Sequence, residues 1–323
     1  MLAPSAFLAS AAGTSHIVQA LLPPMTLLTT RPQEEEALRL WKSCSGSVDP
    51  PTGNATGTQK AWDRPVAVAS ASSLISEASP IARARLLASQ QKEAGAWLTA
   101  PPLSALGLRM DNDSIRVAVG LRLGSALCIP HDCALCAAQV DETEIHALSC
   151  RKSKGRLPRH SYLNDIIKRA QTAINIPCAL EPRGLCRGAG RHPDGISILP
   201  WEQGRCLVWD ATCHNTFAPT NVPFSSKGTG VVANRAAASK RLLYSDLCQS
   251  YTFIPIAVES AGSIGKDALD LHDLGRRTRS KTKDPLSYLK LCQKISVCIQ
   301  RFNSVSVLGC SSTELVFPLF VTL

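Results

Sequence analysis

The stretch Pro193-Asp-Gly-Ile-Ser-Ile-Leu-Pro-Trp-Glu-Gln-Gly-Arg-Cys-Leu-Val-Trp-Asp210 decides the fold of this chain. Residues 196–199 and 205–209 are mainly apolar, and a polar, glycine-containing turn separates them, so they predict two β-strands. Asp194 comes just before the first strand, and Asp210 directly follows the second. If the two strands are neighbours, their carboxylates come together at one point of the sheet.

The residues on either side predict an α/β layer arrangement around these strands. Residues 163–174 carry apolar side chains at helical spacing, and Pro177 ends that predicted helix. Residues 178–180 leave room for a further strand, residues 230–249 predict a helix, and residues 251–259 form a β-rich run. The resulting order is helix, three strands, helix and strand.

Further predicted helices lie outside this arrangement. They cover residues 81–97, 114–123, 266–275 and 285–302, and the last has a continuous apolar stripe typical of a core or an interface. The start of the chain is rich in Ala, Ser, Thr, Pro and Gly, which predicts a disordered leader with a short helix around residues 35–41. We divide the chain into a leader (1–60), a helical region (61–127), a zinc-binding module (128–160), an α/β core (161–282), a C-terminal helix (283–310) and an unassigned tail (311–323).

The composition argues against a secreted, disulfide-bonded protein. The chain has thirteen cysteines, an odd number, and its first 22 residues lack the basic segment of a secretion signal. No apolar run is long enough to cross a bilayer. We therefore expect an intracellular protein, nuclear or cytoplasmic, without membrane contact. The net charge of +10 favours a polyanionic partner without identifying one.

Four closely spaced side chains predict a structural Zn²⁺ site. Zinc binds thiolates and neutral imidazole in a tetrahedron, usually in pairs supplied by tight turns. Cys128 and His131 lie just upstream and could replace a member of the set, and a cysteine-rich chain can also produce such spacing by chance. The predicted ligands follow the pattern Cys133-x2-Cys136-x9-His146-x3-Cys150.

The two acids of the strand pair predict a second kind of metal site. Phosphodiester hydrolysis needs an activated water and stabilisation of the charge that develops on the phosphate, and Mg²⁺ or Mn²⁺ held by carboxylates supplies both. Asp194 and Asp210 suit that role on adjacent strands. The structural alternative is that Pro193-Asp194-Gly195 is an ordinary turn and that Asp210 caps the segment after its strand.

Other charged side chains could complete such a site. Glu181 could orient a second metal ion or a ligand. The residue two positions after Asp210, where nucleases of this kind usually have lysine, is not a lysine, so we assign that role to Lys240 on the following predicted helix. Its neighbour Arg241 competes for the role, and Glu259 at the end of the last predicted strand is a further acidic candidate.

Taken together, these motifs resemble the C-terminal region of polyproteins from non-LTR retrotransposons. In one branch of these elements, a Cys/His zinc motif precedes a restriction-like endonuclease of the PD-(D/E)xK class. The similarity extends from about residue 62 to about residue 309, roughly three quarters of the chain. The matching stretches are Cys128-Ile-Pro-His-Asp-Cys-Ala-Leu-Cys136, His146-Ala-Leu-Ser-Cys150, Arg159-His-Ser-Tyr-Leu-Asn-Asp165, Leu180-Glu-Pro-Arg-Gly184, Arg191-His-Pro-Asp-Gly195, Leu207-Val-Trp-Asp-Ala-Thr-Cys213 and Phe253-Ile-Pro-Ile-Ala-Val-Glu259.

The resemblance implies a restriction-endonuclease-like α/β core, a mixed sheet flanked by helices, preceded by a small zinc-binding helical region. It implies that the protein nicks DNA so that the exposed 3′ end primes reverse transcription, with Asp194 and Asp210 as metal-binding acids and Lys240 as a displaced lysine. The chain has no aromatic-x-Asp-Asp motif, so a reverse transcriptase would act in trans, and the element's RNA is a further candidate partner. Ala137 and His192 depart from the family pattern, which more often has glycine and a basic residue there.

Three interpretations remain open at this point. The chain is a metal-dependent DNA endonuclease, a non-catalytic zinc-containing nucleic-acid-binding module, or an inactive relic of a mobile element. Basic clusters at residues 151–159 and 276–283 would contact phosphates in the first two cases, and they could also be solvated surface.

Overall fold

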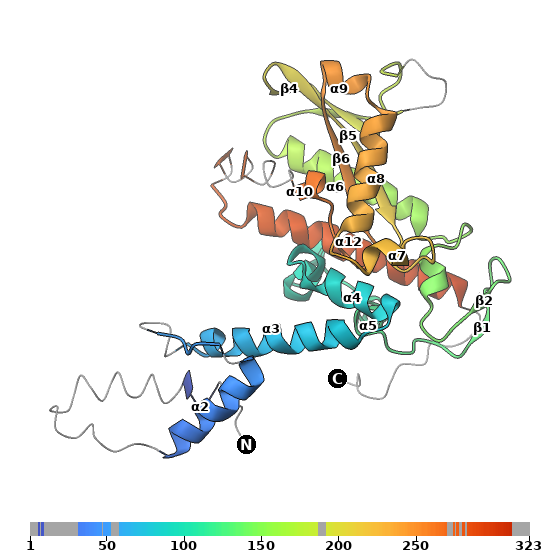
Figure 1. Ribbon diagram of the computed structural model, residues 1–323. Coiled ribbons are helices and arrows are strands. Elements are labelled where there is room, and N and C mark those ends of the chain that lie inside the picture. The colour runs from blue at the N-terminus through green and yellow to red at the C-terminus, as the bar shows by residue number, and fades with distance from the viewer. Residues whose placement is uncertain are drawn as a thin grey trace. The chain divides into compact units, whose positions relative to one another are not determined.

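The computed structural model contains a mixed four-stranded sheet flanked by helices (Figure 1). This confirms the predicted α/β class. The described residues are 6, 8–9, 32–46, 48–52, 58–186, 192–269, 274, 276–277, 280–281 and 283–311. Among them, no helix combines the length and the apolar character needed to cross a bilayer.

Helices and strands alternate irregularly along the chain, and η marks the 3₁₀ helices. The first part contains α2 (Pro32–Ser45), α3 (Gln59–Glu77), α4 (Pro80–Gln90), η3 (Glu93–Thr99), η4 (Ser104–Leu106), α5 (Asn112–Leu123), β1 (His131–Asp132), β2 (Gln139–Val140) and η5 (Ile145–Leu148). The second contains α6 (Arg156–Thr172), β3 (Cys178–Leu180), β4 (Gly195–Glu202), β5 (Arg205–His214), α7 (Val222–Ser225), α8 (Val231–Leu243), α9 (Leu247–Ser250), β6 (Thr252–Glu259), α10 (Lys266–Leu269) and α12 (Ser287–Cys310).

The sheet has the strand order β3-β4-β5-β6. Its first three strands are antiparallel neighbours, whereas β6 runs parallel to β5 after the crossover through α8. The β4–β5 connection is a tight hairpin in which Gln203 has φ +49° and Gly204 has φ +75°. Positive φ at both central residues is what a two-residue hairpin turn requires. The predicted strand pair and its turn are therefore confirmed.

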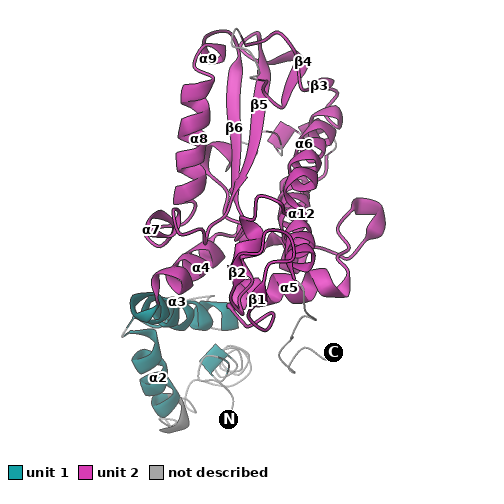
Figure 2. Cartoon of the chain, turned by 90° about the vertical axis from the view of Figure 1, so that its right-hand side faces the viewer, with its two compact units in different colours: residues 1–78 teal, residues 79–323 magenta. Residues whose placement is uncertain are grey.

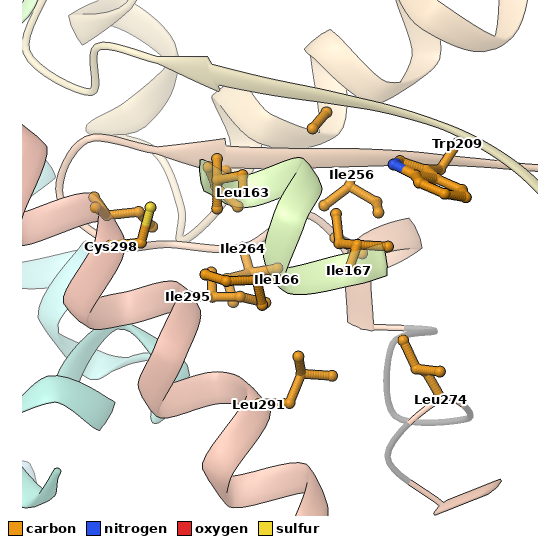
Figure 3. Close-up of a cluster of buried hydrophobic side chains, with 14 of the residues drawn as sticks. Leu163, Ile166, Ile167, Trp209, Ile256, Ile264, Leu274, Leu291, Ile295 and Cys298 are labelled. Carbon is orange, nitrogen blue, oxygen red and sulfur yellow. The ribbon is translucent and has the colours of Figure 1, made fainter. Parts of the chain in front are cut away.

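Helices cover both faces of this sheet. On one face, α6 and α12 pack against β5 and β6 through a large apolar core (Figure 3). On the other face, α8 packs its small side chains, Ala233, Ala236 and Ala237, against Ala257 of β6. The apolar stripe predicted near the C-terminus belongs to α12, which continues to Cys310, and it is buried in the core.

Two compact units divide the chain, residues 1–78 and residues 79–323 (Figure 2). The first has a small core in which Trp41 of α2 packs edge-on against Trp62 of α3, with ring centroids 5.1 Å apart. The indole Nε1 of Trp41 donates a 2.8 Å hydrogen bond to the Trp62 carbonyl. The short helix predicted around residues 35–41 is part of α2. The rest of the leader up to residue 31, apart from residues 6, 8 and 9, and the tail from residue 312 lie outside the described residues.

Candidate functional site

β4 and β5 place Asp194 and Asp210 next to each other. In the antiparallel register Gly195 lies opposite Trp209, and Asp194 directly precedes Gly195 while Asp210 directly follows Trp209. The Asp194 amide donates a 3.0 Å hydrogen bond to the Trp209 carbonyl, which holds the acid beside β5. The strand pairing that brings the two carboxylates together is therefore present.

A close contact between Gly195 and Trp209 fixes this register. A Cβ atom at Gly195 would lie 2.0 Å from Cζ2 of the Trp209 ring, so the ring can cover this position only because it is glycine. The Trp209 indole Nε1 in turn donates a 3.1 Å hydrogen bond to Oδ1 of Asn164 on α6. The turn sequence Pro193-Asp194-Gly195 is thus part of the packing between the sheet and α6.

The Asp194 side chain has two partners in the described part of the chain. Its Oδ2 accepts a 2.6 Å hydrogen bond from the Ala211 amide, and its Oδ1 lies 3.1 Å from Nε2 of His160. The Asp194 side chain is 13% exposed. A carboxylate has enough lone pairs to keep these two contacts and still bind a further cation.

Asp210 is more deeply buried, with 4% of its side chain exposed. Burial raises the pKa of Asp210, and the negative charge of Asp194 raises it further, whereas Lys240 lowers it. The Lys240 Nζ lies 2.7 Å from Asp210 Oδ1. This ammonium group therefore offsets part of the cost of keeping a carboxylate inside the protein.

The two basic candidates point in different directions from α8. Lys240 points to Asp210. Arg241 forms a bidentate salt bridge with Asp267, at 2.9 and 3.1 Å, and donates a hydrogen bond to the Phe253 carbonyl. Adjacent residues on a helix point about 100° apart, so only one of the two can face the acids. The structure places Lys240 there and gives Arg241 a packing role.

His160 is a site residue that the sequence interpretation did not assign. It lies on α6, one helical turn before Asn164, whose Nδ2 is 3.3 Å from the same ring nitrogen that contacts Asp194. The hydrogen bond with Asp194 raises the pKa of His160, although burial opposes the shift. The His160–Asn164 spacing is visible in the sequence, but the contact with Asp194 spans 34 positions.

Tyr244 is a second unassigned neighbour. Its hydroxyl donates a 3.0 Å hydrogen bond to the His192 carbonyl, just before Asp194, and the Lys240 Nζ lies 5.9 Å from its ring centroid. Burial raises the pKa of Tyr244, and the charge of Asp210 adds to this effect. The hydroxyl therefore stays protonated and fixes the backbone that leads into β4.

The two glutamates proposed as extra acids have different positions. Glu181 follows β3, has φ +48°, and donates its amide to the Asp194 carbonyl at 2.9 Å, while its side chain is exposed. Glu259 is only 1% exposed and accepts a 3.1 Å hydrogen bond from the Ala233 amide in the first turn of α8. The register sets Asp210 opposite Pro255, four positions from Glu259 along β6. Glu259 therefore caps α8 and is not part of the acid pair.

A basic cavity of about 820 Å³ lies beside His160. Most of its charged lining is exposed, but Arg159 is only 3% exposed and donates a 3.0 Å hydrogen bond to Asn303 Oδ1 on α12. Within the cluster at residues 151–159 that is predicted to contact phosphate, Arg159 differs from the other basic residues, because burial and Asn303 fix its guanidinium. The exposed basic residues of the lining are Arg151, Lys152, Lys154 and Arg156.

The second predicted basic cluster is described only in part, because residues 278, 279 and 282 lie outside the described ranges. Within it, the Arg277 guanidinium stacks 4.0 Å from the ring centroid of Trp201 and donates a 2.7 Å hydrogen bond to the Trp201 carbonyl. Arg277 therefore packs against β4.

The predicted zinc ligands form a cluster that could hold a metal ion such as zinc. Their donor atoms all lie within 4.8 Å of one another, and Cys136 Sγ lies 3.2 Å from His146 Nε2. Although burial disfavours its thiolate, the amides of Leu135 and Cys136 hold the pKa of Cys133 below its usual value. A lowered thiol pKa favours metal binding. The four residues are Cys133, Cys136, His146 and Cys150.

The local fold explains how this cluster assembles. The connection between β1 and β2 carries Cys133 and Cys136. The Cys133 amide donates to the Ala138 carbonyl at 2.8 Å and closes the loop that contains both cysteines. The short helix η5 presents His146, and the Cys150 amide bonds back to the His146 carbonyl at 2.9 Å. Cys310, at the end of α12, is fully buried beside the cluster, and the Ala134 amide donates to its carbonyl at 3.0 Å.

All thirteen cysteines fall within the described residues, and none of them forms a disulfide there. No protein-family model matches the chain, and no curated protein matches it significantly. The geometry of the acid pair, the basic cavity and the Cys/His cluster therefore carries the functional argument.

Proposed function

We propose that the chain is a metal-dependent DNA endonuclease of the non-LTR retrotransposon type, with a restriction-endonuclease-like core that nicks target DNA. The observation that carries this proposal is the juxtaposition of three side chains at the start of β4, within β5 and on α8. Asp194 and Asp210 flank the Gly195–Trp209 pair of the β4–β5 register, and Lys240 of α8 reaches Asp210 at 2.7 Å. Two neighbouring carboxylates can hold the metal ion that assists phosphodiester hydrolysis, and the lysine adds a positive charge beside them.

The acid pair fits a hard divalent cation. Mg²⁺ and Mn²⁺ prefer oxygen ligands, and Mg²⁺ is usually held by one or two carboxylates together with water and phosphate oxygens. Asp194 and Asp210 would hold the ion, which supplies an activated water and stabilises charge on the phosphate when bound. The buried Asp210 gains from such a cation because its charge is only partly offset within the protein.

The side chains around the acids have separate tasks in this proposal. The Lys240 ammonium stabilises negative charge that develops on the phosphate, at a position fixed by its ion pair with Asp210. The His160 ring, 45% exposed between Asp194 and the basic cavity, orients the Asp194 carboxylate by hydrogen bonding. Asn164 lies beside that ring on α6, with its Nδ2 3.3 Å from His160 Nε2, and its own Oδ1 accepts a hydrogen bond from Trp209 of β5.

DNA would bind along the basic cavity that adjoins His160. Arg151, Lys152, Lys154 and Arg156 are exposed there, and contacts of this kind with backbone phosphates supply affinity without sequence preference. The Cys/His cluster directly precedes these basic residues in the sequence. A structural zinc there would fix the backbone from which the lining of the cavity begins. A reverse transcriptase would act in trans, with the element's RNA as a further partner.

One observation favours a second candidate, a nucleic-acid-binding module without catalysis. Each carboxylate of the pair already has a basic partner within the protein, His160 for Asp194 and Lys240 for Asp210. If these contacts persist when DNA binds, a divalent cation has to compete with them. The basic cavity would then bind DNA while the acids serve only the fold.

Nicking of supercoiled plasmid with Mg²⁺ or Mn²⁺ distinguishes the two candidates. We expect Asp194→Asn and Asp210→Asn to lower the nicking rate by about 100-fold or more while DNA affinity changes little. Asp165→Asn is the matched control, because Asp165 is another acid of this region but pairs with Arg169 on the surface of α6. Wild-type protein that binds DNA without nicking it would favour the binding module, and nicking that survives both substitutions would refute the acid pair.

A further inference from the structure

A second group of potential metal ligands lies next to the Cys/His cluster. The donor atoms of Cys128, His131 and Glu144 all lie within 4.8 Å of one another, and His131 Nε2 is 3.3 Å from Glu144 Oε1. The three side chains are almost completely shielded from solvent: Cys128 is 3% exposed, the His131 side chain 5% and Glu144 0%. This group belongs to neither the acid pair nor the set of four ligands described above.

Three polar atoms of this group, His131 Nε2, Glu144 Oε1 and Glu144 Oε2, are buried without an aligned hydrogen bond in the described part of the chain. The other two are in contact with backbone, since Cys128 Sγ donates to the Asp141 carbonyl at 3.3 Å and His131 Nδ1 lies 3.0 Å from the Ile129 carbonyl. A buried carboxylate in the state of Glu144 is costly, because it has lost its hydration and no hydrogen bond of the described residues replaces it. Native proteins avoid such groups unless an ion or a water completes them. Three donor atoms that converge on one point need a ligand at that point.

The backbone holds the three residues in place before any ligand arrives. The Leu127 amide donates to the Glu142 carbonyl at 2.7 Å, and the Glu144 amide donates to the Asp141 carbonyl at 3.2 Å. Glu144 itself has φ +55°, a left-handed conformation that is unfavourable for a glutamate. Strain of this kind in a buried, charged residue is typical of positions held for a ligand.

We propose that Cys128, His131 and Glu144 form a second zinc site, interleaved with the first. One thiolate, one imidazole and one carboxylate are all common zinc ligands, and a water completes the tetrahedron. Zinc bonds of about 2.0–2.3 Å place neighbouring ligand atoms about 3.3–3.8 Å apart, and the His131–Glu144 contact of 3.3 Å fits that spacing.

The order of the ligands along the chain gives the two sites a shared structural role. Cys128 and His131 precede the first pair of the other site, and Glu144 falls between its two pairs. Each ion therefore closes a loop that contains ligands of the other. The segment is short, and its secondary structure consists of a hairpin with two-residue strands and one 3₁₀ helix. Metal ions that cross-link such a segment supply most of its order.

Metal analysis and zinc X-ray absorption on the full chain test this proposal. We expect two zinc ions per chain and an average of two sulfur ligands per zinc, because four cysteines are shared between two ions. A single zinc with three sulfur ligands would overturn the second site. The expected result, two zinc ions per chain, would also exclude the alternative in which Cys128 or His131 replaces a ligand of the first site.

Two substitutions assign the ion to these residues. His131→Ala and Glu144→Gln should each reduce the content to one zinc and raise the average to three sulfur ligands. Glu142→Gln is the matched control, since Glu142 is an exposed acid two positions away, and it should keep both ions. Two ions retained in both site variants would refute the assignment. If the variants fail to fold, the wild-type sulfur count still decides the question.

Discussion

At the scale of single residues, Gly195 has the sharpest steric requirement in the acid pair. A methyl group there would sit 2.0 Å from the Trp209 ring, which has to move and then loses its hydrogen bond to Asn164. We expect Gly195→Ala to lower the free energy of unfolding by about 3 kcal/mol, measured by urea denaturation. The displaced ring should also disturb the backbone on both sides of Asp194 and Asp210.

Gly204 provides the control for this substitution. It lies in the β4–β5 turn with φ +75°, and an added Cβ meets nothing within 4 Å. Gly204→Ala therefore adds only the backbone strain of a left-handed alanine, about 1 kcal/mol. A Gly195→Ala variant no less stable than Gly204→Ala would show that Trp209 relaxes freely.

Lys240 stabilises the fold through its ion pair with the buried Asp210. We expect Lys240→Ala to cost about 2 kcal/mol near neutral pH, because the Asp210 carboxylate stays buried without its partner. The pKa of Asp210 is already raised, mainly by burial, and it rises further when the ammonium is removed. A carboxyl whose pKa is raised in the folded state costs no stability while it is protonated in both states. It lowers the stability of the fold as the pH rises above its pKa in the unfolded chain. The difference from wild type should therefore vanish below about pH 4 and grow as the pH rises.

Urea denaturation of both proteins from pH 4 to pH 8 measures this difference. Arg241→Ala is the neighbouring control, because it breaks the more exposed pair with Asp267 and should cost no more than about 1 kcal/mol. Adding Asp210→Asn to Lys240→Ala should recover stability at neutral pH, since no buried charge remains. An equal loss at pH 4 and pH 7.5 would mean that Lys240 acts through packing alone.

At the scale of elements, local patterns in the sequence predicted the sheet well. The strand at residues 178–180 and the hairpin around Gly204 follow from strand-forming side chains and turn chemistry, which are local properties. The helix α3 was not predicted as an element, because its apolar residues have little helical periodicity and Pro65 lies inside it. The contact of His160 with Asp194 could not be predicted either, because it depends on how α6 packs against the sheet.

The β1–β2 hairpin and the end of α12 pack together in this structure. The Ala134 amide bonds to the Cys310 carbonyl, and buried Val307 and Cys310 pack in the same core as Cys133 and Cys150. We expect Cys133→Ser to lose the ion of the first cluster and lower Tm by about 10 °C. Hydrogen exchange should become faster both in the hairpin and in the last turns of α12.

Cys206→Ser is the control for thiol removal, because this cysteine lies on β5, away from the Cys/His cluster, and its thiol makes a long 3.9 Å contact with the Ile198 carbonyl. It should leave Tm and zinc content unchanged. A strong chelator should reproduce the effect of Cys133→Ser in the wild-type protein. Faster exchange in the hairpin alone would show that α12 is ordered without the metal.

At the scale of the whole molecule, the residues of the proposed sites are concentrated in one compact unit. The acid pair, the basic cavity and both groups of metal ligands lie within residues 79–323, whereas residues 1–78 have a separate core around Trp41 and Trp62. The boundary falls directly before Ser79, whose hydroxyl accepts a hydrogen bond from the Ala82 amide and caps α4. A chain that begins at Ser79 keeps this cap.

We therefore expect residues 79–323 to fold without the first 78 and to keep the zinc content and the plasmid nicking rate of the full chain. Each unit buries its own tryptophans, so removal of the first unit takes no side chain from the core that surrounds the acid pair. Calorimetry should show the transition of the larger unit within about 2–4 °C of its position in the full chain, which corresponds to a change of about 1 kcal/mol. A truncated protein that aggregates, or that melts more than about 10 °C lower, would mean that the first unit stabilises the larger one. Loss of DNA affinity at an unchanged Tm would instead assign the first unit a role in binding the substrate.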